Sequence, residues 1–558
     1  MNMATPSNPN ISDQAIDRLL NYWAIEQQQR QIQQENEQVV AVSEQGGMTC
    51  EYRYDSLGQL VQIIEPGNSV TTYEYDPQSR LQRVIHPDES TTEYDYGSSD
   101  RLVHICDRGL VYRFSHDAQG RLQQVHKGNA GSTVYRYDAS GNVAEARTAE
   151  VSTTYQYSNS GQMTQLAQTI QGVTLAIEWI YDAENRLVQV KLPQVPDAIH
   201  YTWDEENWLA QVQWGKISLA TVEYHRAEKV TQIHYGNGIT ETTYADAIDA
   251  RPVSRHVQRG TEVLWEQHRQ YLPSGQLQCD GERQYDYDCQ GRLTHVATMI
   301  QHKITRNYHI PSDWNYYYND RDAMIGYEAS TGNYDSFFAI APQLQFDYFG
   351  RLRYLTQPLT QPAGQRVYRY NDAHQLIQIL ENGSSIATLT YDAKGHVVFN
   401  KMVDRVERYV YGSDDRLMLV TDGQGNLLRS YVWTPLGLLA EIWLSQGEIF
   451  YRHQDDLGTS RLITDSTGQV CDRLLYSPYG EPIGTPQFQP LFTGHFWHPN
   501  LRLYNYGARW YDPNLAQFIT PDSYTGAPDD ERIVNAITPA SKQLFARADI
   551  LSTWLKYP

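Results

Sequence analysis

The chain is poor in the features that mark several common protein classes. It has only five cysteines among 558 residues, scattered and without Cys-x-x-Cys spacing, so neither a disulfide framework nor a zinc site is predicted. It has no run of about 18 apolar residues, so no membrane-spanning helix is expected. It lacks basic clusters and carries a net charge of −21, which argues against nucleic-acid binding, since phosphate contacts need clustered Lys and Arg.

Targeting signals are also missing. The N-terminus has no basic segment followed by an apolar run, so no cleavable secretory signal is predicted. Few and unpaired cysteines are typical of synthesis in a reducing compartment. We therefore expect a protein made in the cytoplasm, which leaves the cell, if it does, by a route that reads no cleavable signal.

What the chain has in excess is tyrosine, with 42 residues against 12 phenylalanines. From residue 51 onward, polar and apolar residues alternate with a period of two, interrupted by turn residues, which predicts β-hairpins. A Tyr-Asp pair or a close variant then recurs at intervals of roughly 20 residues, the mark of a repeat protein. Copies include Tyr54-Asp55, Tyr75-Asp76, Tyr94-Asp95, Tyr137-Asp138, Tyr181-Asp182, Trp203-Asp204, Tyr287-Asp288 and Tyr391-Asp392.

The turn of each repeat has a consistent chemistry. Three residues after the Asp stands a glycine, as at Gly58 and Gly141, or an asparagine, as at Asn185 and Asn207. Gly and Asn tolerate positive φ, and an Asp can accept hydrogen bonds from N–H groups two residues on. A lone hairpin is marginal in water, so successive units are expected to pair edge to edge, with tyrosines stacked in rows. A functional alternative to this structural role is that the rows of tyrosines bind sugar rings.

The two ends depart from this pattern. Ser12 followed by apolar residues at helical spacing predicts a short helix, and the Gln- and Glu-rich residues 26–38 predict a solvated helix or a linker. Residues 1–45 are thus expected to be a helical cap or a docking segment, and residues 46–485 the repeat array. A Pro- and Gly-rich stretch from Pro478 introduces a once-only segment, residues 486–530. Thr538-Pro539 then predicts the start of an amphipathic helix within residues 531–558.

Candidate chemistry is limited to carboxylates of the once-only segment, namely Asp512, Asp522, Asp529 and Asp530. Two carboxylates brought close cannot both ionise readily, so one can serve as base and the other as acid on a peptide bond. A turn-forming role is the default for each. His495 and His498 are flanked by Gly494 and Pro499, which disfavour a helix, so no metal site is predicted there. No Gly-x-Ser-x-Gly elbow is present.

The repeated Tyr-x-Tyr-Asp-x-x-Gly-x-Leu unit resembles the YD repeats of Rhs proteins, and residues 503–522 resemble the Rhs repeat-associated core motif. The resemblance covers nearly the whole chain after residue 50. It implies an all-β fold of hairpins wound into a continuous sheet forming a hollow shell, as in the similar C subunits of Tc toxins, with short helices at both termini. In many members the core motif acts as an aspartyl autoprotease. The resemblance therefore makes Asp522 and Asp512 the candidate catalytic residues and Arg509 a supporting one.

Some positions depart from the family pattern. Ala516-Gln517 stands where Gly-Arg is usual, and Ser523 follows Asp522 where the family has Pro. No downstream cleavage motif, toxin-like domain or preceding PAAR-like segment is evident, so we expect the shell alone, without self-cleavage.

The resemblance implies as partners a C-terminal toxin, covalent or separate, enclosed in the shell, together with secretion spike or chaperone proteins. It implies a type VI-like export route and a role in competition between bacteria or against a host. No cofactor, metal or nucleic acid is expected. The alternative is a cell-surface adhesion or carbohydrate-binding module.

Overall fold

The computed structural model describes residues 30–520, except for 36–37, 45–48, 66–68, 226–228, 247–251, 273–275, 289–291, 299–312, 319–323, 331–334, 340–343, 347–351, 357–364 and 508. This part of the chain is almost entirely β structure, with short 3₁₀ helices at η1 (Gly128–Ala130) and η4 (Phe492–Gly494). No helix within it is both long and apolar enough to cross a membrane. The predicted all-β shell architecture is confirmed. The helices expected after Ser12 and within residues 531–558 lie outside the described residues.

The first sheet is a meander of 23 strands in which each strand pairs antiparallel with the next along the chain. Its strands are β1 (Arg30–Glu35), β2 (Gln38–Glu44), β3 (Thr49–Tyr54), β4 (Leu60–Glu65), β5 (Ser69–Tyr75), β6 (Leu81–Ile85), β7 (Thr91–Tyr96), β8 (Leu102–Asp107), β9 (Leu110–His116), β10 (Leu122–Lys127), β11 (Ser132–Tyr137), β12 (Val143–Arg147), β13 (Val151–Tyr157), β14 (Met163–Ile170), β15 (Val173–Tyr181), β16 (Leu187–Lys191), β17 (Ile199–Trp203), β18 (Leu209–Trp214), β19 (Ile217–His225), β20 (Val230–Tyr235), β21 (Ile239–Ala245), β22 (Pro252–Arg259) and β23 (Glu262–His268).

Three further sheets of 7, 13 and 4 strands follow in chain order. The second contains β24 (Gln270–Tyr271), β25 (Leu277–Cys279), β26 (Arg283–Tyr287), β27 (Leu293–Thr298), β28 (Asp313–Tyr318), β29 (Met324–Ser330) and β30 (Asp335–Ala339). The third contains β31 (Leu344–Phe346), β32 (Leu352–Thr356), β33 (Gln365–Tyr370), β34 (Leu376–Glu381), β35 (Ser384–Tyr391), β36 (Val397–Met402), β37 (Val406–Tyr411), β38 (Leu417–Asp422), β39 (Leu427–Thr434), β40 (Gly437–Trp443), β41 (Glu448–Gln454), β42 (Ser460–Thr464) and β43 (Val470–Arg473). The fourth contains β44 (Phe496–His498), β45 (Leu503–Asn505), β46 (Trp510–Asp512) and β47 (Gln517–Phe518).

The prediction of a helix or linker over residues 26–38 was wrong for the residues that the structure describes. There, β1 and β2 form an antiparallel hairpin, with Ile32 opposite Val42. The hairpin joins the sheet through β2, which pairs with β3. A free sheet edge offers unpaired backbone N–H and C=O groups to an incoming strand. That pairing outweighs the weak helix preference of Gln and Glu.

The predicted Asp-initiated turns are confirmed in most of the described repeats. The copy predicted at Tyr94-Asp95 was wrong, because Asp95 lies within β7 and the turn of that unit begins at Gly97. In the turn after β3, Oδ1 of Asp55 accepts hydrogen bonds from the N–H groups of Leu57 and Gln59, at 2.8 and 2.9 Å. Gly58 has a φ of 82°, and Asn185 occupies the same place in a later unit with a φ of 62°. In several units the second carboxylate oxygen also accepts from the arginine four residues on, as Asp76 does from Arg80 at 2.7 Å.

Tyrosine hydroxyls connect successive units. The hydroxyl of the Tyr directly before a turn donates to the carbonyl at the start of the previous unit's return strand. Examples are Tyr75 to Leu60, Tyr96 to Leu81, Tyr137 to Leu122, Tyr157 to Val143, Tyr391 to Leu376 and Tyr411 to Val397, with Trp203 and Trp433 donating similarly through Nε1 to Leu187 and Leu417. The expectation of stacked rings did not include this bond, which fixes the spacing of neighbouring hairpins.

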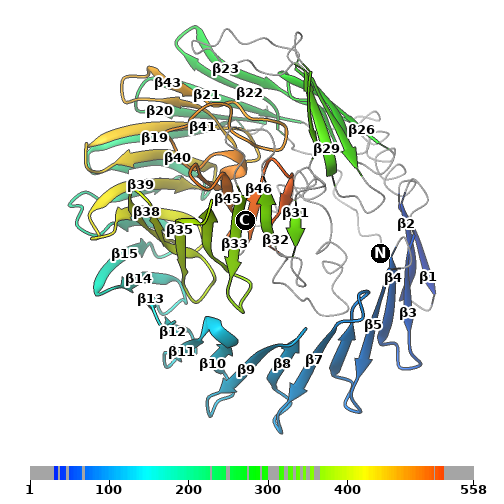
Figure 1. The fold of residues 1–558 in the computed structure, drawn as a ribbon. Coiled ribbons are helices and arrows are strands. Elements are labelled where there is room, and N and C mark those ends of the chain that lie inside the picture. The colour runs from blue at the N-terminus through cyan, green and yellow to red at the C-terminus, as the bar shows by residue number, and fades with distance from the viewer. Residues whose placement is uncertain are drawn as a thin grey trace, which may run out of the picture.

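The chain winds back over itself, so that the third sheet covers part of the first. Hydrogen bonds join residues between 199 and 260 positions apart, from Arg255 with Gln454 to Tyr112 with Asp372. One apolar cluster contains residues 146–265 of the first sheet together with residues 410–462 of the third. Figure 1 shows the strands of the third sheet running alongside the first on the inner side of a curved path.

The middle of the third sheet, from β36 to β42, is largely buried on both faces. Val410 and Val432 pack into the cluster shared with the first sheet, whereas their neighbours Tyr409 and Tyr431 pack against the terminal strands. In β38 and β42 every residue but Asp422 is buried. The terminal strands β44 to β47 therefore form a third layer, which Figure 1 shows near β33 on the inner side of the curve.

The hydroxyl of Tyr391 links these layers, and its removal has a predictable effect on stability. It donates to the carbonyl of Leu376 at 2.7 Å and accepts from Nε1 of Trp510 in β46 at 3.0 Å, in a buried site. Tyr391→Phe leaves both groups unpaired, so we expect a loss of about 1–3 kcal/mol in the free energy of unfolding. Tyr96→Phe, at a half-buried position with one such bond, should cost about 1 kcal/mol or less. Urea unfolding of both variants checks this, and equal losses would contradict it.

Candidate functional site

The once-only segment forms a compact meander of very short strands. Leu503 to Asn505 pairs with Phe496 to His498 on one side and with Trp510 to Asp512 on the other. Its buried apolar side chains join two clusters. Trp510, Leu503 and Ile519 pack on the third sheet, whereas Tyr504 and Tyr511 pack with Tyr476, Phe488 and Leu491.

The loop that precedes this segment, residues 477–484, is held by the core motif itself. The Tyr504 hydroxyl donates to the carbonyl of Gly480 at 2.7 Å, and the Tyr511 hydroxyl donates to the carbonyl of Tyr479 at 2.9 Å. Gly480 has a φ of 97°, and a Cβ there would meet the ring of Phe492 at 2.4 Å. The Pro- and Gly-rich stretch that sequence marks as a boundary thus presents Glu481 to the terminal strands.

Asp512 is the predicted site residue that the structure places most clearly. It ends β46 with only 4% of its surface exposed, and its Oδ1 accepts a hydrogen bond from the N–H of Asn514 at 2.9 Å. This is the turn-forming role expected by default. Burial raises the pKa of its carboxyl to about 6, with a further rise from Glu481, against lowering by N–H groups of the turn and by Arg502.

Glu481 and Arg502 complete a charged group around Asp512. Oε1 of Glu481 accepts from the Arg502 guanidinium at 2.5 Å. With its nitrogen turned toward Glu481, the side-chain amide of Asn514 donates to Oε2 at 2.6 Å. Burial raises the pKa of Tyr368 in the third sheet, and the charge of Asp512 raises it further. The site therefore holds two carboxyl groups, of which one titrates near neutral pH.

The other predicted residues have different outcomes. The guanidinium of Arg509 lies over the ring of Phe518, 3.8 Å from its centroid. Asp522, Asp529 and Asp530 lie outside the described residues, so the structure does not test their place beside Asp512. Sequence reasoning missed Glu481, Arg502 and Tyr368. Their separation from Asp512 along the chain leaves no local pattern that could identify them.

His495 and His498 face different surroundings. His495 stacks on Tyr506 with ring centroids 3.6 Å apart. His498 is buried between Tyr409 and Trp510, and its Nδ1 lies 3.3 Å from Nδ2 of Asn400. Burial lowers the pKa of His498 to about 4, so this imidazole is neutral near pH 7.

Ala516 stands where the family usually has glycine, and its backbone conformation shows what that position requires. It occupies the tight connection between β46 and β47 with a φ of 50°. This left-handed conformation costs a residue with a Cβ roughly 1–2 kcal/mol, whereas glycine adopts it freely. The left-handed backbone at this position explains why the family usually has glycine there. This chain forms the same turn with alanine.

The ionisation of Asp512 should make stability depend on pH. Its folded pKa of about 6 is above the ordinary 3.8, so the folded state binds the proton more tightly. This contribution is complete below about pH 4 and is lost as the pH rises through 6, a difference of about 3 kcal/mol. Asp512→Asn keeps the acceptor for the Asn514 N–H but cannot ionise. We expect the variant to lose less stability than the wild type between pH 5 and 7.5 in urea unfolding.

Asp465→Asn is the matched control, since Asp465 is a turn residue whose pKa is lowered, mainly by hydrogen bonds from Thr467 and Gln469 against the opposing effect of burial. This variant should keep the pH dependence that Asp512 gives to the free energy of unfolding. The titration of His498 is the same in all the variants, so it does not affect the comparison. The same pH slope in Asp512→Asn and the wild type would contradict the assignment.

The sequence matches the family described as Teneurin YD-shell over residues 17–193 and 267–534. It is 25% identical to the tRNA nuclease WapA of Bacillus subtilis strain 168 over 176 residues, 30% of this chain and 8% of that protein. It is 24% identical to human Teneurin-4 over 261 residues, 43% of this chain and 9% of that protein. The chain thus spans less than a tenth of these relatives.

The fold is similar to solved structures of TcdB2–TccC3 proteins. A TcdB2–TccC3–TEV structure superposes with a TM-score of 0.67 over 90% of this chain and 30% of that one, at 14% identity. A TcdB2–TccC3 structure without its hypervariable C-terminal region gives 0.66 over 90% of this chain and 30% of that one, at 13% identity. At such identity the likeness shows the fold alone, a YD-repeat shell.

Proposed function

The chain belongs to the Teneurin YD-shell family, and we propose that it serves as an encapsulation shell that houses and helps deliver a C-terminal toxin. The toxin is a segment or partner enclosed by the wound sheets, exported by a type VI-like route with spike or chaperone proteins. Its role is competition between bacteria or against a host.

The position of the terminal strands carries this proposal. Residues 496–519 pack on the face of the third sheet that is turned away from the first sheet. The Tyr370 hydroxyl donates to the carbonyl of Ile519 at 3.2 Å, which anchors the end of the described chain on that face. A segment after Thr520 therefore starts from the innermost layer, where an enclosed cargo would lie.

Two relatives support the cargo role by their names. WapA is described as a tRNA nuclease, and one similar TccC3 structure was obtained without its hypervariable C-terminal region. A shell that accepts different C-terminal segments is consistent with both. The net charge of −21 fits a shell without nucleic-acid contacts of its own.

Protection of the C-terminus tests the proposal. An unstructured epitope fused after Pro558 should survive limited trypsin digestion of the folded protein, because the shell excludes the protease. The same epitope placed in the exposed turn at residues 404–405 of the folded shell should be lost quickly. Urea above the unfolding midpoint should abolish the difference. Equal loss of both epitopes in the native protein would contradict encapsulation. Binding to a glycan array that is lost when Tyr244 is changed would favour the adhesion alternative.

For Asp512, we propose that it and Asp522 hydrolyse a peptide bond after the shell, with Arg509 in support. One carboxylate would take a proton from the attacking water, and the other carboxyl would protonate the leaving amine. A pKa of about 6 suits both protonation states near neutral pH. Glu481 helps to keep that pKa raised.

Because this chain departs from the family pattern after Asp522, its purified form should show a single intact mass over days at pH 6 to 8. Addition of a family-type Asp-Pro-x-Gly-Leu segment after Pro558 should allow cleavage, and Asp512→Asn should abolish it. Arg405→Gln, an exposed change away from the site, serves as control. Cleavage that persists in Asp512→Asn would rule out this role for Asp512.

A further inference from the structure

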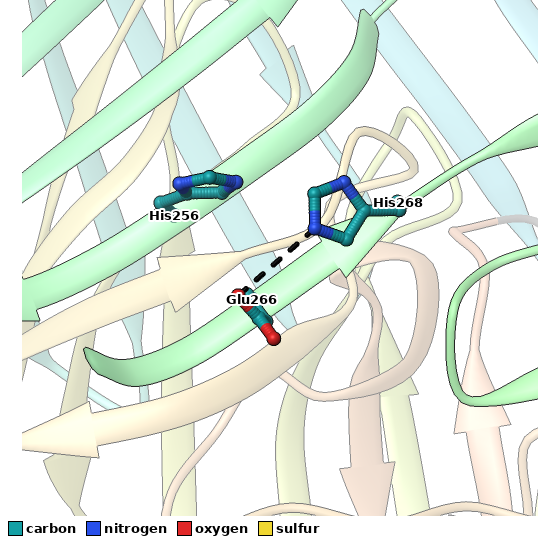
Figure 2. A group of neighbouring side chains, drawn as sticks. All are labelled: His256, Glu266 and His268. Atoms are coloured by element: carbon teal, nitrogen blue, oxygen red, sulfur yellow. Dashed lines mark ion pairs between the residues drawn. The ribbon is translucent and has the colours of Figure 1, made fainter.

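A group of metal-binding side chains lies outside the terminal site, on β22 and β23. His256, Glu266 and His268 each offer a ligand atom, and these atoms all lie within 4.8 Å of one another. Figure 2 shows the two imidazoles turned toward each other with the Glu266 carboxylate beside them. Among the described residues, this is the group of three His, Cys, Asp or Glu side chains whose ligand atoms come this close together.

The strand register explains why the three side chains meet. His256 lies directly opposite Glu266, and His268 lies opposite Ser254, two residues from His256 on the same strand. Alternate residues of a strand share a face, so all three side chains stand on one face of the hairpin. The opposite face holds the buried Val257 and Gln267, so the rigid core positions the exposed group.

Local contacts orient the ligands. Nε2 of His268 is 4.0 Å from Oε2 of Glu266, and the two imidazole centroids are 5.2 Å apart. The Ser254 hydroxyl lies 2.9 Å from Nε2 of His256, and the Tyr244 ring borders the same imidazole. Tetrahedral zinc bonds of about 2 Å place ligand atoms about 3.3 Å apart. Small side-chain rotations at an exposed surface close that gap.

We propose that His256, Glu266 and His268 bind one Zn²⁺ ion, with water in the fourth position. Two imidazoles and one carboxylate suit zinc and similar transition metals, whereas Ca²⁺ and Mg²⁺ prefer oxygen ligands alone. The ion would join β22 to β23, the last strand of the 23-stranded sheet, at the point where the chain passes to the next sheet. His256 and Glu266 also fall in residues 194–266, which the family match leaves out.

The chain supplies its own matched control. His225, Glu223 and His234 have the same residue types on β19 and β20, with both imidazoles within 3.9 Å of the carboxylate. In this group, however, the three ligand atoms do not all come within 4.8 Å of one another. It should therefore bind zinc far more weakly, although its composition and exposure are similar.

The test uses the untagged full chain, freed of metal by a chelator and titrated with Zn²⁺ against a chromophoric competitor at pH 7.5. We expect one tight equivalent and a rise in the thermal midpoint. His268→Ala and His256→Ala should each weaken binding about tenfold or more, the size known for loss of even outer-shell partners. Glu266→Gln should weaken it as well. His234→Ala should leave it unchanged.

Co²⁺ gives a second readout, since a four-coordinate site yields an intense visible band that His268→Ala should remove. All these side chains are exposed or half-buried, so the variants should fold, which circular dichroism checks. Zinc affinity that is equal in wild type and His268→Ala, or that falls equally in His234→Ala, would overturn the proposal.

Discussion

The burial of both faces in the middle of the third sheet, from β36 to β42, is the constraint on which the rest of the structure depends. Antiparallel hairpins in series leave one face of every sheet to be covered, since a half-exposed apolar face is unstable in water. The buried apolar core that the first sheet shares with the third begins at about residue 146. The third sheet in turn needs the terminal strands on its other face. Each layer is therefore stable only when the chain has wound back over itself.

Buried charges lie where the layers meet and make that arrangement specific. Glu241 of the first sheet pairs with Arg255 at 3.0 Å, and Arg255 pairs with Asp456, in the turn between β41 and β42, at 2.5 Å. Arg269 joins the same carboxylate at 2.7 Å, and His453 reaches Glu241 at 3.2 Å. Buried ion pairs add little net stability, but a buried charge without its partner costs several kcal/mol. A shifted layer would leave several such charges unpaired, so the network favours one alignment.

Local chemistry made the repeats predictable. An Asp, followed three residues later by Gly or Asn, sets the turn within five residues, and the structure has it at Asp55 and Asp182 as expected. The N-terminal residues 30–44 were misjudged because their strands depend on pairing with a neighbour instead of their own preference. The Tyr hydroxyl bonds also escaped prediction, since a donor and a carbonyl about 15 residues apart meet only when hairpins lie side by side.

The sequence by itself determined the turns and the strands between them, because each depends on neighbouring residues, and the repeated unit was enough to indicate the shell family. The tertiary structure alone decided which charges surround Asp512 and which side chains share a face at His256. At Val257 and Gln258 the pairing shifts by one residue, so that Leu264 and Trp265 both turn to the core. Without that bulge Glu266 would lie opposite Arg255, and Glu266 and His268 would stand on the face opposite to His256. Packing of two apolar side chains over the core, which no local pattern encodes, therefore assembles the group proposed to bind zinc.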